Sequence, residues 1–226
     1  MFRFVDRKKK EHLAFIPGWG FDGRVFANLD LPYNYYFFDD ADITKFEDEL
    51  KKILPENNIE RISIFGWSQG AFEACNFASK NPGIVEEIIL VSVRKRYEKE
   101  NLNYIKKHIL KNRTAFMCKF YRQCFCAEEQ DQYSWFKIAL LKDYLDKMST
   151  EMLVEGLDWL GEVEIRPELL KGLKCIKIIH GKEDKVAPAE EAVWIANSLP
   201  QAELITFEEA GHLPFLQPGF EKRLYE

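Results

Sequence analysis

The sequence predicts an α/β protein with a mostly parallel central sheet flanked by helices. Short apolar runs recur along the chain and helical segments separate most of them, which is typical of strand–helix–strand units with right-handed crossovers. Several runs are continuously apolar, as expected for strands that are buried on both faces. The predicted strands are at residues 2–5, 12–16, 35–38, 62–65, 88–92, 175–179 and 203–207.

Helices are predicted between these strands, at residues 42–54, 69–80 and 189–199. The second of them ends at Asn81-Pro82-Gly83, where proline and glycine stop a helix. A long segment without a strand pattern follows the strand at 88–92. The helices predicted in it are at residues 101–126, 130–147 and 149–160, with breaks around Asn112 and at residues 127–128. The segment between the strands at 88–92 and 175–179 is therefore expected to be helical.

The most informative motif is Gly66-Trp67-Ser68-Gln69-Gly70, a G-x-S-x-G pattern between an apolar strand and a predicted helix. Such a turn holds the serine in a strained backbone conformation, and its glycines let the strand and the helix approach closely. The first N–H groups of the helix then point at the group that the serine attacks. Ser68 is therefore predicted to be a nucleophile. The alternative is an ordinary Gly-Ser turn between two core elements.

A serine hydroxyl needs a base, and the chain has four histidines. His12 and His180 stand at the ends of apolar runs, and His108 lies in a lysine-rich helical stretch. His212 follows a predicted strand and lies between Gly211 and Pro214, in a loop of the kind that carries catalytic residues. His212 is therefore predicted to be the base.

The acid that orients the histidine is predicted in the polar turn after the strand at 175–179. Asp184 is the favoured residue and Glu183 is the second choice. The alternative for Asp184 is a turn aspartate that accepts hydrogen bonds from its own backbone.

The chain order of serine, acid and histidine resembles the α/β-hydrolase superfamily, from the strand at Leu13 to the loop after His212. The resemblance implies the α/β-hydrolase fold. Residues 1–93 and 165–226 would form its core, and residues 94–164 would form a helical cap inserted before the acid-bearing strand. The resemblance also implies an oxyanion hole made by the backbone N–H groups of Trp19 and Gln69. The early loop departs from the family pattern, because Pro17 stands where a histidine is usual.

Composition excludes several other classes. With 226 residues, 46% of them hydrophobic, the chain is long enough to bury a core and is not disordered. No apolar run approaches the roughly 20 residues that span a bilayer, and the charged N-terminus is unlike a signal peptide, so the cytoplasm is the expected location. Cys118, Cys124 and Cys126 have no histidine or carboxylate at ligand spacing, so we expect no metal, and no nucleotide loop indicates a cofactor.

Residues 94–122 carry ten basic and two acidic side chains, a charge of +8 in a chain whose net charge is −5. A basic surface on an acidic protein favours an acidic partner, and the alternative is a solvated helix face. Nucleic acid is not expected, since the rest of the chain would repel phosphates and no recognition motif is present. Aromatic residues lie near the motifs and in the predicted cap. Those expected to line a narrow acyl pocket, rather than to pack the core, are Trp19, Trp67, Phe125 and Phe215.

Within the superfamily the chain resembles the pimeloyl-[acyl-carrier protein] methyl ester esterases of biotin synthesis. The resemblance lies in residues 17–20, 66–70 and 155–160. It implies a monomeric serine esterase that cleaves a small methyl ester at the end of an acyl chain held on acyl carrier protein. The acidic carrier is expected on the basic cap residues, and the candidates are Arg113, Lys119 and Arg122. The chain ends 14 residues after His212, so the closing helix is expected to be short or missing.

Two other classes of function stay open at this point. One is a different enzyme with the same three catalytic residues: a general carboxylesterase, a thioesterase or a carbon–carbon lyase such as those of menaquinone synthesis. The other is a non-catalytic protein that uses a hydrolase fold to bind a ligand, because fold alone does not fix function.

Overall fold

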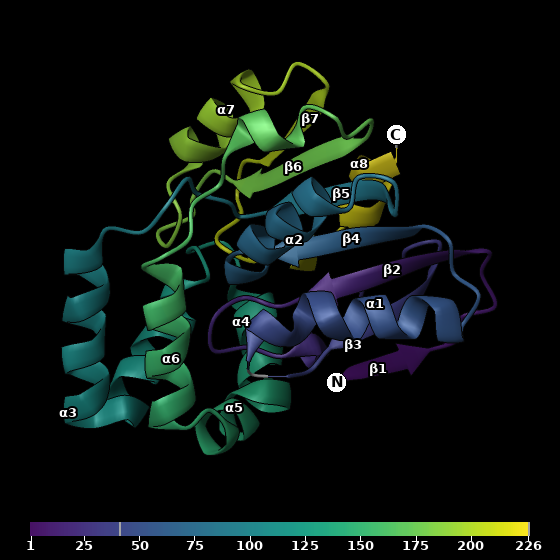
Figure 1. Ribbon diagram of the computed structural model, residues 1–226. Coiled ribbons are helices and arrows are strands. Elements are labelled where there is room, and N and C mark those ends of the chain that lie inside the picture. The colour runs from purple at the N-terminus through teal and green to yellow at the C-terminus, as the bar shows by residue number, and fades with distance from the viewer. Residues whose placement is uncertain (41, 226) are drawn as a thin grey trace.

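A computed structural model describes residues 1–40 and 42–225, and in these residues the chain forms one seven-stranded sheet (Figure 1). The strand order is β1-β3-β2-β4-β5-β6-β7. β1 is antiparallel to β3, and all the other neighbouring pairs are parallel. The strands are β1 Phe2–Val5, β2 Glu11–Ile16, β3 Tyr33–Phe38, β4 Ile62–Trp67, β5 Val85–Val91, β6 Ile176–Gly181 and β7 Ala202–Phe207.

Each predicted strand coincides with one of these seven to within three residues at either end, so the predicted α/β fold class is confirmed. The apolar runs at β3 and β4 are buried along their whole length, as expected for strands covered on both faces. The sheet is thus the rigid part of the core from which the loops of the site emerge.

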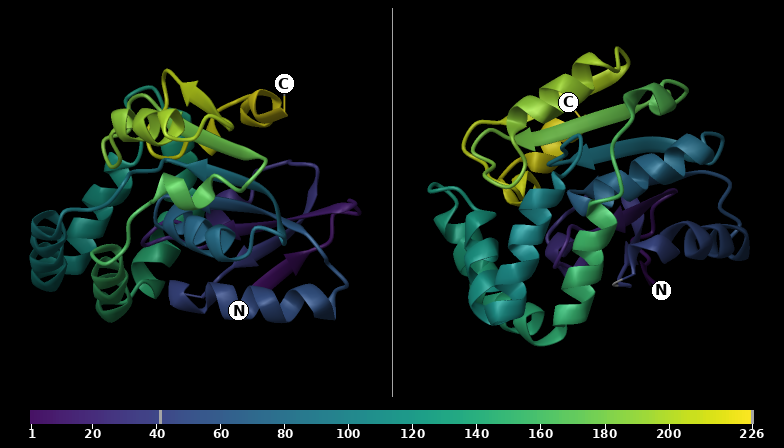
Figure 2. Two further views of the ribbon diagram at one scale, coloured as in Figure 1. Left: turned by 45° about the horizontal axis from the view of Figure 1, so that its top comes forward. Right: turned by 60° about the vertical axis from the view of Figure 1, so that its left-hand side comes forward.

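Helices cover both faces of the sheet: α1 and α2 lie on one face, and α8 lies on the other (Figures 1 and 2). Strand β4 shows how the two faces are packed. A Cβ added at Gly66 would lie 2.7 Å from the Cβ of Ala74 on α2. The preceding residue, Phe65, points to the opposite face of the sheet and faces Phe220 of α8, with ring centroids 6.3 Å apart. The core helices are α1 Phe46–Glu56, α2 Gln69–Lys80, α7 Ala189–Asn197 and α8 Phe220–Tyr225.

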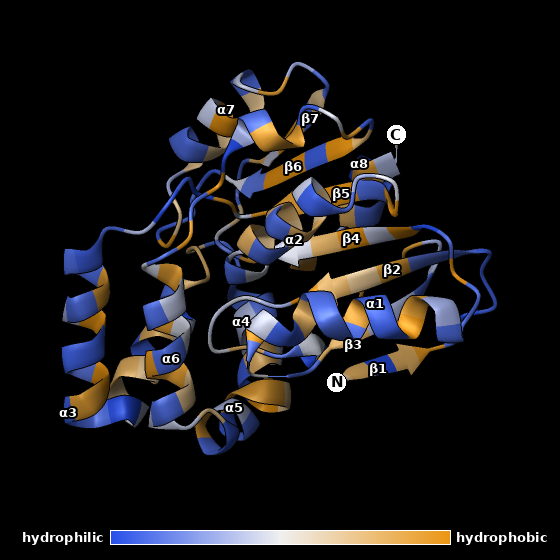
Figure 3. Cartoon of the chain, in the orientation of Figure 1, coloured by the Kyte–Doolittle hydropathy of each residue, from blue (hydrophilic) through white to orange (hydrophobic). Residues whose placement is uncertain are grey.

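Four further helices lie beside the carboxyl ends of β2, β4 and β6, where the arrowheads point in Figure 1. The hydrophobic residues of α3 lie on the side that faces α6 (Figure 3). These helices are α3 Lys99–Gln123, α4 Gln130–Phe136, α5 Lys142–Lys147 and α6 Thr150–Leu160. We call them the cap helices; the assignment of residues 94–164 to a separate cap stays a prediction.

The predicted breaks in this segment are present. Asn112 has non-helical backbone angles (φ −161°, ψ 88°) inside α3, and residues 124–129 separate α3 from α4. The predicted helix at 130–147 is divided, because a π-turn at Lys137–Leu141 stands between α4 and α5. The closing helix α8 is short, as expected. Residue 226, the last of the expected core, lies outside the described residues.

Within residues 1–40 and 42–225, no helix is both long and apolar enough to cross a bilayer, and no cluster of histidine, cysteine and carboxylate side chains has the geometry of a metal site. All five cysteines are free thiols.

Candidate active site

Ser68 occupies the turn between β4 and α2 with φ 54° and ψ −113°, a backbone conformation that residues other than glycine rarely adopt. The two glycines of the motif make this turn possible. A Cβ at Gly66 would meet Ala74, and one at Gly70 would collide with the backbone carbonyl of Ile16. Strand, turn and helix are therefore packed against one another at Ser68, and the backbone has little freedom to relax there.

His212, in the loop after β7, connects Ser68 to an acid. Its Nε2 lies 2.9 Å from the Oγ of Ser68, and its Nδ1 lies 2.7 Å from Oδ2 of Asp184. The backbone of the histidine is held as well, because its carbonyl accepts hydrogen bonds from the indole Nε1 of Trp67 (2.7 Å) and the hydroxyl of Ser92 (2.9 Å). The three predicted side chains, which come from three separate loops, are thus within hydrogen-bonding distance of one another.

Asp184 follows β6 and uses its two oxygens differently. Oδ1 accepts from the backbone N–H groups of Val186 (2.7 Å) and Ala187 (2.9 Å), and Oδ2 faces His212. Burial by itself raises the pKa of Asp184, but the facing imidazole and these backbone donors outweigh it and hold the pKa below its ordinary value. Asp184 is therefore both a turn aspartate and the partner of the histidine, while Glu183 is exposed.

A second histidine, His180, also lies near this acid. Its Nε2 is 2.9 Å from the carbonyl oxygen of Ala187 and 3.4 Å from Oδ2 of Asp184, and burial lowers its pKa. The strand-end position of His180 in the sequence did not indicate this contact. His12 and His108 lie elsewhere, on β2 and on the exposed surface of α3.

Two backbone amides beside the serine are open to a ligand. Within residues 1–40 and 42–225, neither the N–H of Trp19 nor that of Gln69 donates to an acceptor in the protein. The Trp19 loop is close to the nucleophile position, since a Cβ at Gly18 would lie 3.2 Å from the Cβ of Ser68. Gln69 is the first residue of α2, so the helix dipole adds to its amide. The oxyanion hole that they were predicted to form stays a prediction.

Trp19 lines one cavity and Phe120 lines another, and the two rings pack edge-on against each other at a centroid distance of 5.0 Å. The first, which we call the Trp19 cavity, has a volume of about 410 Å³; its walls include Trp19, Gln69, Met148, Met152 and Leu153. The second, the Tyr97 cavity, has a volume of about 500 Å³; its walls include Tyr97, Lys111, Phe116, Lys119 and Phe120. Ser68 itself is 6% exposed and lines neither cavity.

The cap helices contact the core around the site through a small set of hydrogen bonds. They run from the Trp19 indole to the Leu153 carbonyl (2.9 Å), from the Gln69 side chain to the Gly156 carbonyl (3.3 Å) and from the Tyr121 hydroxyl to the Gly20 carbonyl (2.7 Å). Each links a cap residue to one of the two loops that carry the open amides. The cap helices therefore contact both loops beside Ser68.

Of the four aromatic residues predicted to bind substrate, the structure places only Trp19 at one of these cavities. Trp67 is fully buried and packs against Phe215, with ring centroids 5.2 Å apart. Phe125 is buried against Phe136 of α4, at 5.5 Å. All three side chains are buried, since large aromatic groups gain most from burial.

The basic residues predicted to bind a carrier are also divided. Arg113 donates to backbone carbonyls at the C-terminal end of α5, including that of Leu145 at 2.7 Å. Arg122 donates to the carbonyl of Phe125 at 3.1 Å. Both guanidinium groups thus satisfy carbonyls that the ends of helices leave open. Lys119 is exposed and lines the Tyr97 cavity.

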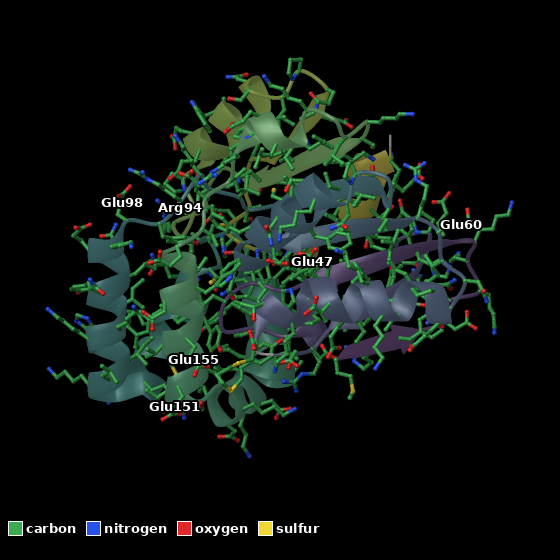
Figure 4. All side chains as sticks on the ribbon, viewed as in Figure 1. Glu47, Glu60, Arg94, Glu98, Glu151 and Glu155 are labelled. Carbon is green, nitrogen blue, oxygen red and sulfur yellow. The ribbon has the colours of Figure 1, made fainter. Side chains whose placement is uncertain are left out.

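Three of the ten basic side chains of residues 94–122 pair with acids from other segments. Arg94 and Glu98 lie where the chain leaves the core for α3 (Figure 4), and Arg94 pairs with Glu191 of α7 at 3.0 Å. The other pairs of this kind are Lys99 with Glu162 and Lys106 with Asp158. The surface of the folded protein is consequently less basic here than the linear count indicates.

The parallel sheet, the strained serine at its carboxyl edge and the Ser–His–Asp geometry define the hydrolase class of α/β proteins. Comparison with known families agrees: the family described as the alpha/beta hydrolase fold matches residues 30–218, and the chain belongs to it.

Curated relatives include two proteins named pimeloyl-[acyl-carrier protein] methyl ester esterase. The one from Nitrosomonas europaea is 28% identical over 181 residues, covering 75% of this chain and 71% of the relative. The one from Legionella pneumophila (strain Corby) is 22% identical over 218 residues, covering 90% and 88%. Among solved structures, a thermophilic esterase from Thermogutta terrifontis superposes with a TM-score of 0.82 at 19% identity, covering 99% of this chain and 90% of that one. Family and relatives together support an enzyme of the carboxylic ester hydrolase class.

Proposed function

We propose that this protein is a serine carboxylesterase in which Ser68, His212 and Asp184 form the catalytic triad. The observation that carries the proposal is the continuous contact from Ser68 Oγ through the imidazole to Asp184, at 2.9 and 2.7 Å. In this mechanism His212 Nε2 accepts the hydroxyl proton as the Oγ attacks the ester carbonyl. Asp184 keeps the imidazole in the required tautomer and stabilises its positive charge.

The negative charge that develops on the carbonyl oxygen is taken up by the open N–H groups of Trp19 and Gln69. Donors of this kind each contribute about 3–4 kcal/mol to lowering the barrier. His212 then gives its proton to the departing alkoxide, so the alcohol leaves and an acyl-serine remains. Water, deprotonated by the same histidine, attacks the acyl carbon and regenerates Ser68 with release of the acid.

The substrate that we propose is an acyl chain carried on acyl carrier protein and ending in a methyl ester, as in the pimeloyl methyl ester of biotin synthesis. The names of the relatives support this choice. The Tyr97 cavity supports it too, since it is apolar inside and basic side chains stand around it: Arg94, Lys111, Lys119 and Lys185. An aliphatic chain would lie inside the Tyr97 cavity while the acidic carrier rests on the lysines around it. Of the three residues predicted to bind the carrier, Lys119 takes part in this arrangement, whereas Arg113 and Arg122 do not.

Charge reversal tests the carrier. Lys111→Glu/Lys119→Glu is expected to lower kcat/KM on a carrier-bound methyl ester by about tenfold or more, because steering of an acidic partner is lost. The free methyl ester of the same acid should be hydrolysed as before. The matched control is Lys10→Glu/Lys52→Glu, which makes the same change of charge at exposed lysines outside the cap. An equal loss on both substrates would refute the carrier. Restoring growth without biotin to a strain that lacks its own such esterase tests the biological role.

A general carboxylesterase is a second candidate, and one observation favours it. The Trp19 cavity of about 410 Å³ lies next to the proposed oxyanion hole and is far larger than a methoxy group requires. If it receives the alcohol part of the ester, butyl and hexyl esters should be hydrolysed at least as fast as the methyl ester of the same acid. A steep loss with alcohol length would exclude this candidate and leave the methyl ester.

A further inference from the structure

Glu129 is a carboxylate enclosed between the cap and the loop that carries His212. It immediately precedes α4 and is only 1% exposed. Among the residues that the structure describes, no lysine, arginine or histidine forms an ion pair with it. A carboxylate without a cation is costly to bury, so its hydrogen bonds must compensate.

Three donors converge on this carboxylate from both sides. Oε2 accepts from the backbone N–H of Cys126 at 2.8 Å and from that of Gly211 at 3.0 Å, and Oε1 accepts from the side-chain amide of Gln217 at 2.7 Å. Cys126 belongs to the turn between α3 and α4, whereas Gly211 and Gln217 flank His212 on the core side. The two oxygens therefore join a cap turn to both ends of the histidine loop.

The turn at residues 124–129 and the loop that carries His212 are joined by a second contact, one residue after Gly211. The backbone N–H of His212 donates to the carbonyl of Cys124 at 2.8 Å. The fit is close, since a Cβ at Gly211 would lie 2.6 Å from that carbonyl oxygen and 2.9 Å from Oε2 of Glu129. The backbone on the N-terminal side of the imidazole is thus fixed by the 124–129 turn.

We propose that Glu129 is a positioning residue: through Gly211 and Gln217 it fixes the loop that places the imidazole of His212 between Ser68 and Asp184. It does not touch the reacting atoms. The inference rests on the proposed role of His212 as the base. It makes the position of a core histidine depend on a turn of the cap, so the base is correctly placed only while that turn is docked.

The isosteric change Glu129→Gln tests this. A glutamine oxygen can still accept from Gly211 and Cys126, but its NH2 then faces the NH2 of Gln217. Gln217 can turn its amide around only by losing its bond to the carbonyl of Glu209, now 3.0 Å. We expect kcat on a small soluble ester to fall by about 10²-fold, the usual cost of a small misplacement, with KM within about twofold of wild type. Glu128→Gln is the matched control, because it removes the same charge from an exposed neighbour.

A spectroscopic readout separates positioning from folding. The proton that His212 Nδ1 shares with Asp184 should give a far-downfield NMR signal in the wild type and in Glu128→Gln, and a broadened or absent signal in Glu129→Gln. If Glu129→Gln does not fold, Gln217→Ala removes only the bond to Oε1, and it should show a smaller fall in kcat with the same direction of spectral change.

The outcomes are decisive in each direction. Unchanged kcat with an unchanged downfield signal in a folded variant, a rise confined to KM, or an equal loss in Glu128→Gln would each overturn the positioning role. Failure of the proposed function looks different: wild-type protein would then turn over no ester, while the NMR comparison of the variants would still report on the imidazole.

Discussion

The core and the cap contribute to the site in different ways. On the core side, Ser68 and Asp184 each stand within a few residues of the end of a buried parallel strand, and β4 and β6 are separated in the sheet only by β5. On the cap side, the contacts to the core combine aromatic packing, such as Trp19 against Phe120, with hydrogen bonds, such as that from Trp19 to Leu153. Strand register sets the first group of positions, and side-chain packing with separate hydrogen bonds sets the second.

The difference teaches where chemistry and selectivity are encoded. A change at a strand end alters Ser68 or Asp184, the groups proposed to act in catalysis. A change in the cap helices alters their packing and the Trp19 and Tyr97 cavities, so it should affect which esters react and how stable the cap helices are. Variants in the two regions should therefore differ in kind as well as in size.

The largest effect is expected in the core, at the nucleophile. Ser68→Ala should lower hydrolysis of short p-nitrophenyl esters by about 10⁴-fold or more, because loss of one triad member disables the whole unit. The measurement is kcat with a circular-dichroism check of the fold. Ser79→Ala, at a half-buried serine near the other end of the same helix, is the control. Near-wild-type turnover by Ser68→Ala would refute the nucleophile and favour a ligand-binding role.

A second core effect concerns stability and depends on pH. Glu73 on α2 is buried, and burial raises its pKa from 4.5 to about 7. The folded state therefore binds its proton more tightly than the unfolded state, and this contribution to stability is lost as pH rises from 4.5 to about 7. At pH 8, Glu73→Gln should raise the free energy of unfolding by up to about 3 kcal/mol, the equivalent of that shift. At pH 4 the gain should vanish.

Urea unfolding at the two pH values measures this difference. Glu60→Gln, at an exposed residue labelled in Figure 4, should change neither value. A gain in Glu73→Gln that is independent of pH would show that the carboxylate is not the cause.

In the cap helices, Arg113→Ala should lower the free energy of unfolding more than it changes the rate of ester hydrolysis. The guanidinium satisfies carbonyls at the end of α5, and its removal is expected to cost about 1–3 kcal/mol. Lys119→Ala, on the same helix, should stay within about 0.5 kcal/mol. Thermal unfolding of the two variants gives the comparison; equal destabilisation would mean that Arg113 is no more structural than its neighbour.

The smallest effect is expected from salt. Added NaCl should lower kcat/KM several-fold for a carrier-bound ester, since exposed charges are screened over about 10 Å at 0.1 M. The free ester should respond by less than about twofold. The same response for both substrates would mean that the salt acts on the enzyme rather than on the approach of a carrier.

The strands and the meeting of Ser68, Asp184 and His212 could be predicted because local pattern carries them: apolar runs, one strained turn, and a chain order that only a parallel sheet brings together. Their catalytic roles stay predictions. The burial of Trp67 and the hydrogen bonds of Arg113 to backbone carbonyls could not be predicted, because adjacency along the chain does not tell which way a side chain points or which carbonyls a fold leaves open.

Glu129 and His180 were missed for a related reason. Neither belongs to a motif, and a single glutamate before a helix looks like a solvated residue. The positioning role proposed for Glu129 depends on three hydrogen-bond donors, and two of them come from a segment about 80 residues away along the chain. A buried polar cluster of this kind becomes visible only when the packing is known.

The enclosure of Ser68 has a consequence for the catalytic cycle. Ser68 is 6% exposed and lines neither the Trp19 cavity nor the Tyr97 cavity, so side chains between the serine and the Tyr97 cavity have to move before an acyl chain lying there can reach the hydroxyl. If this movement is slower than the chemical steps, it sets the rate of turnover, and kcat should fall as the solvent is made more viscous.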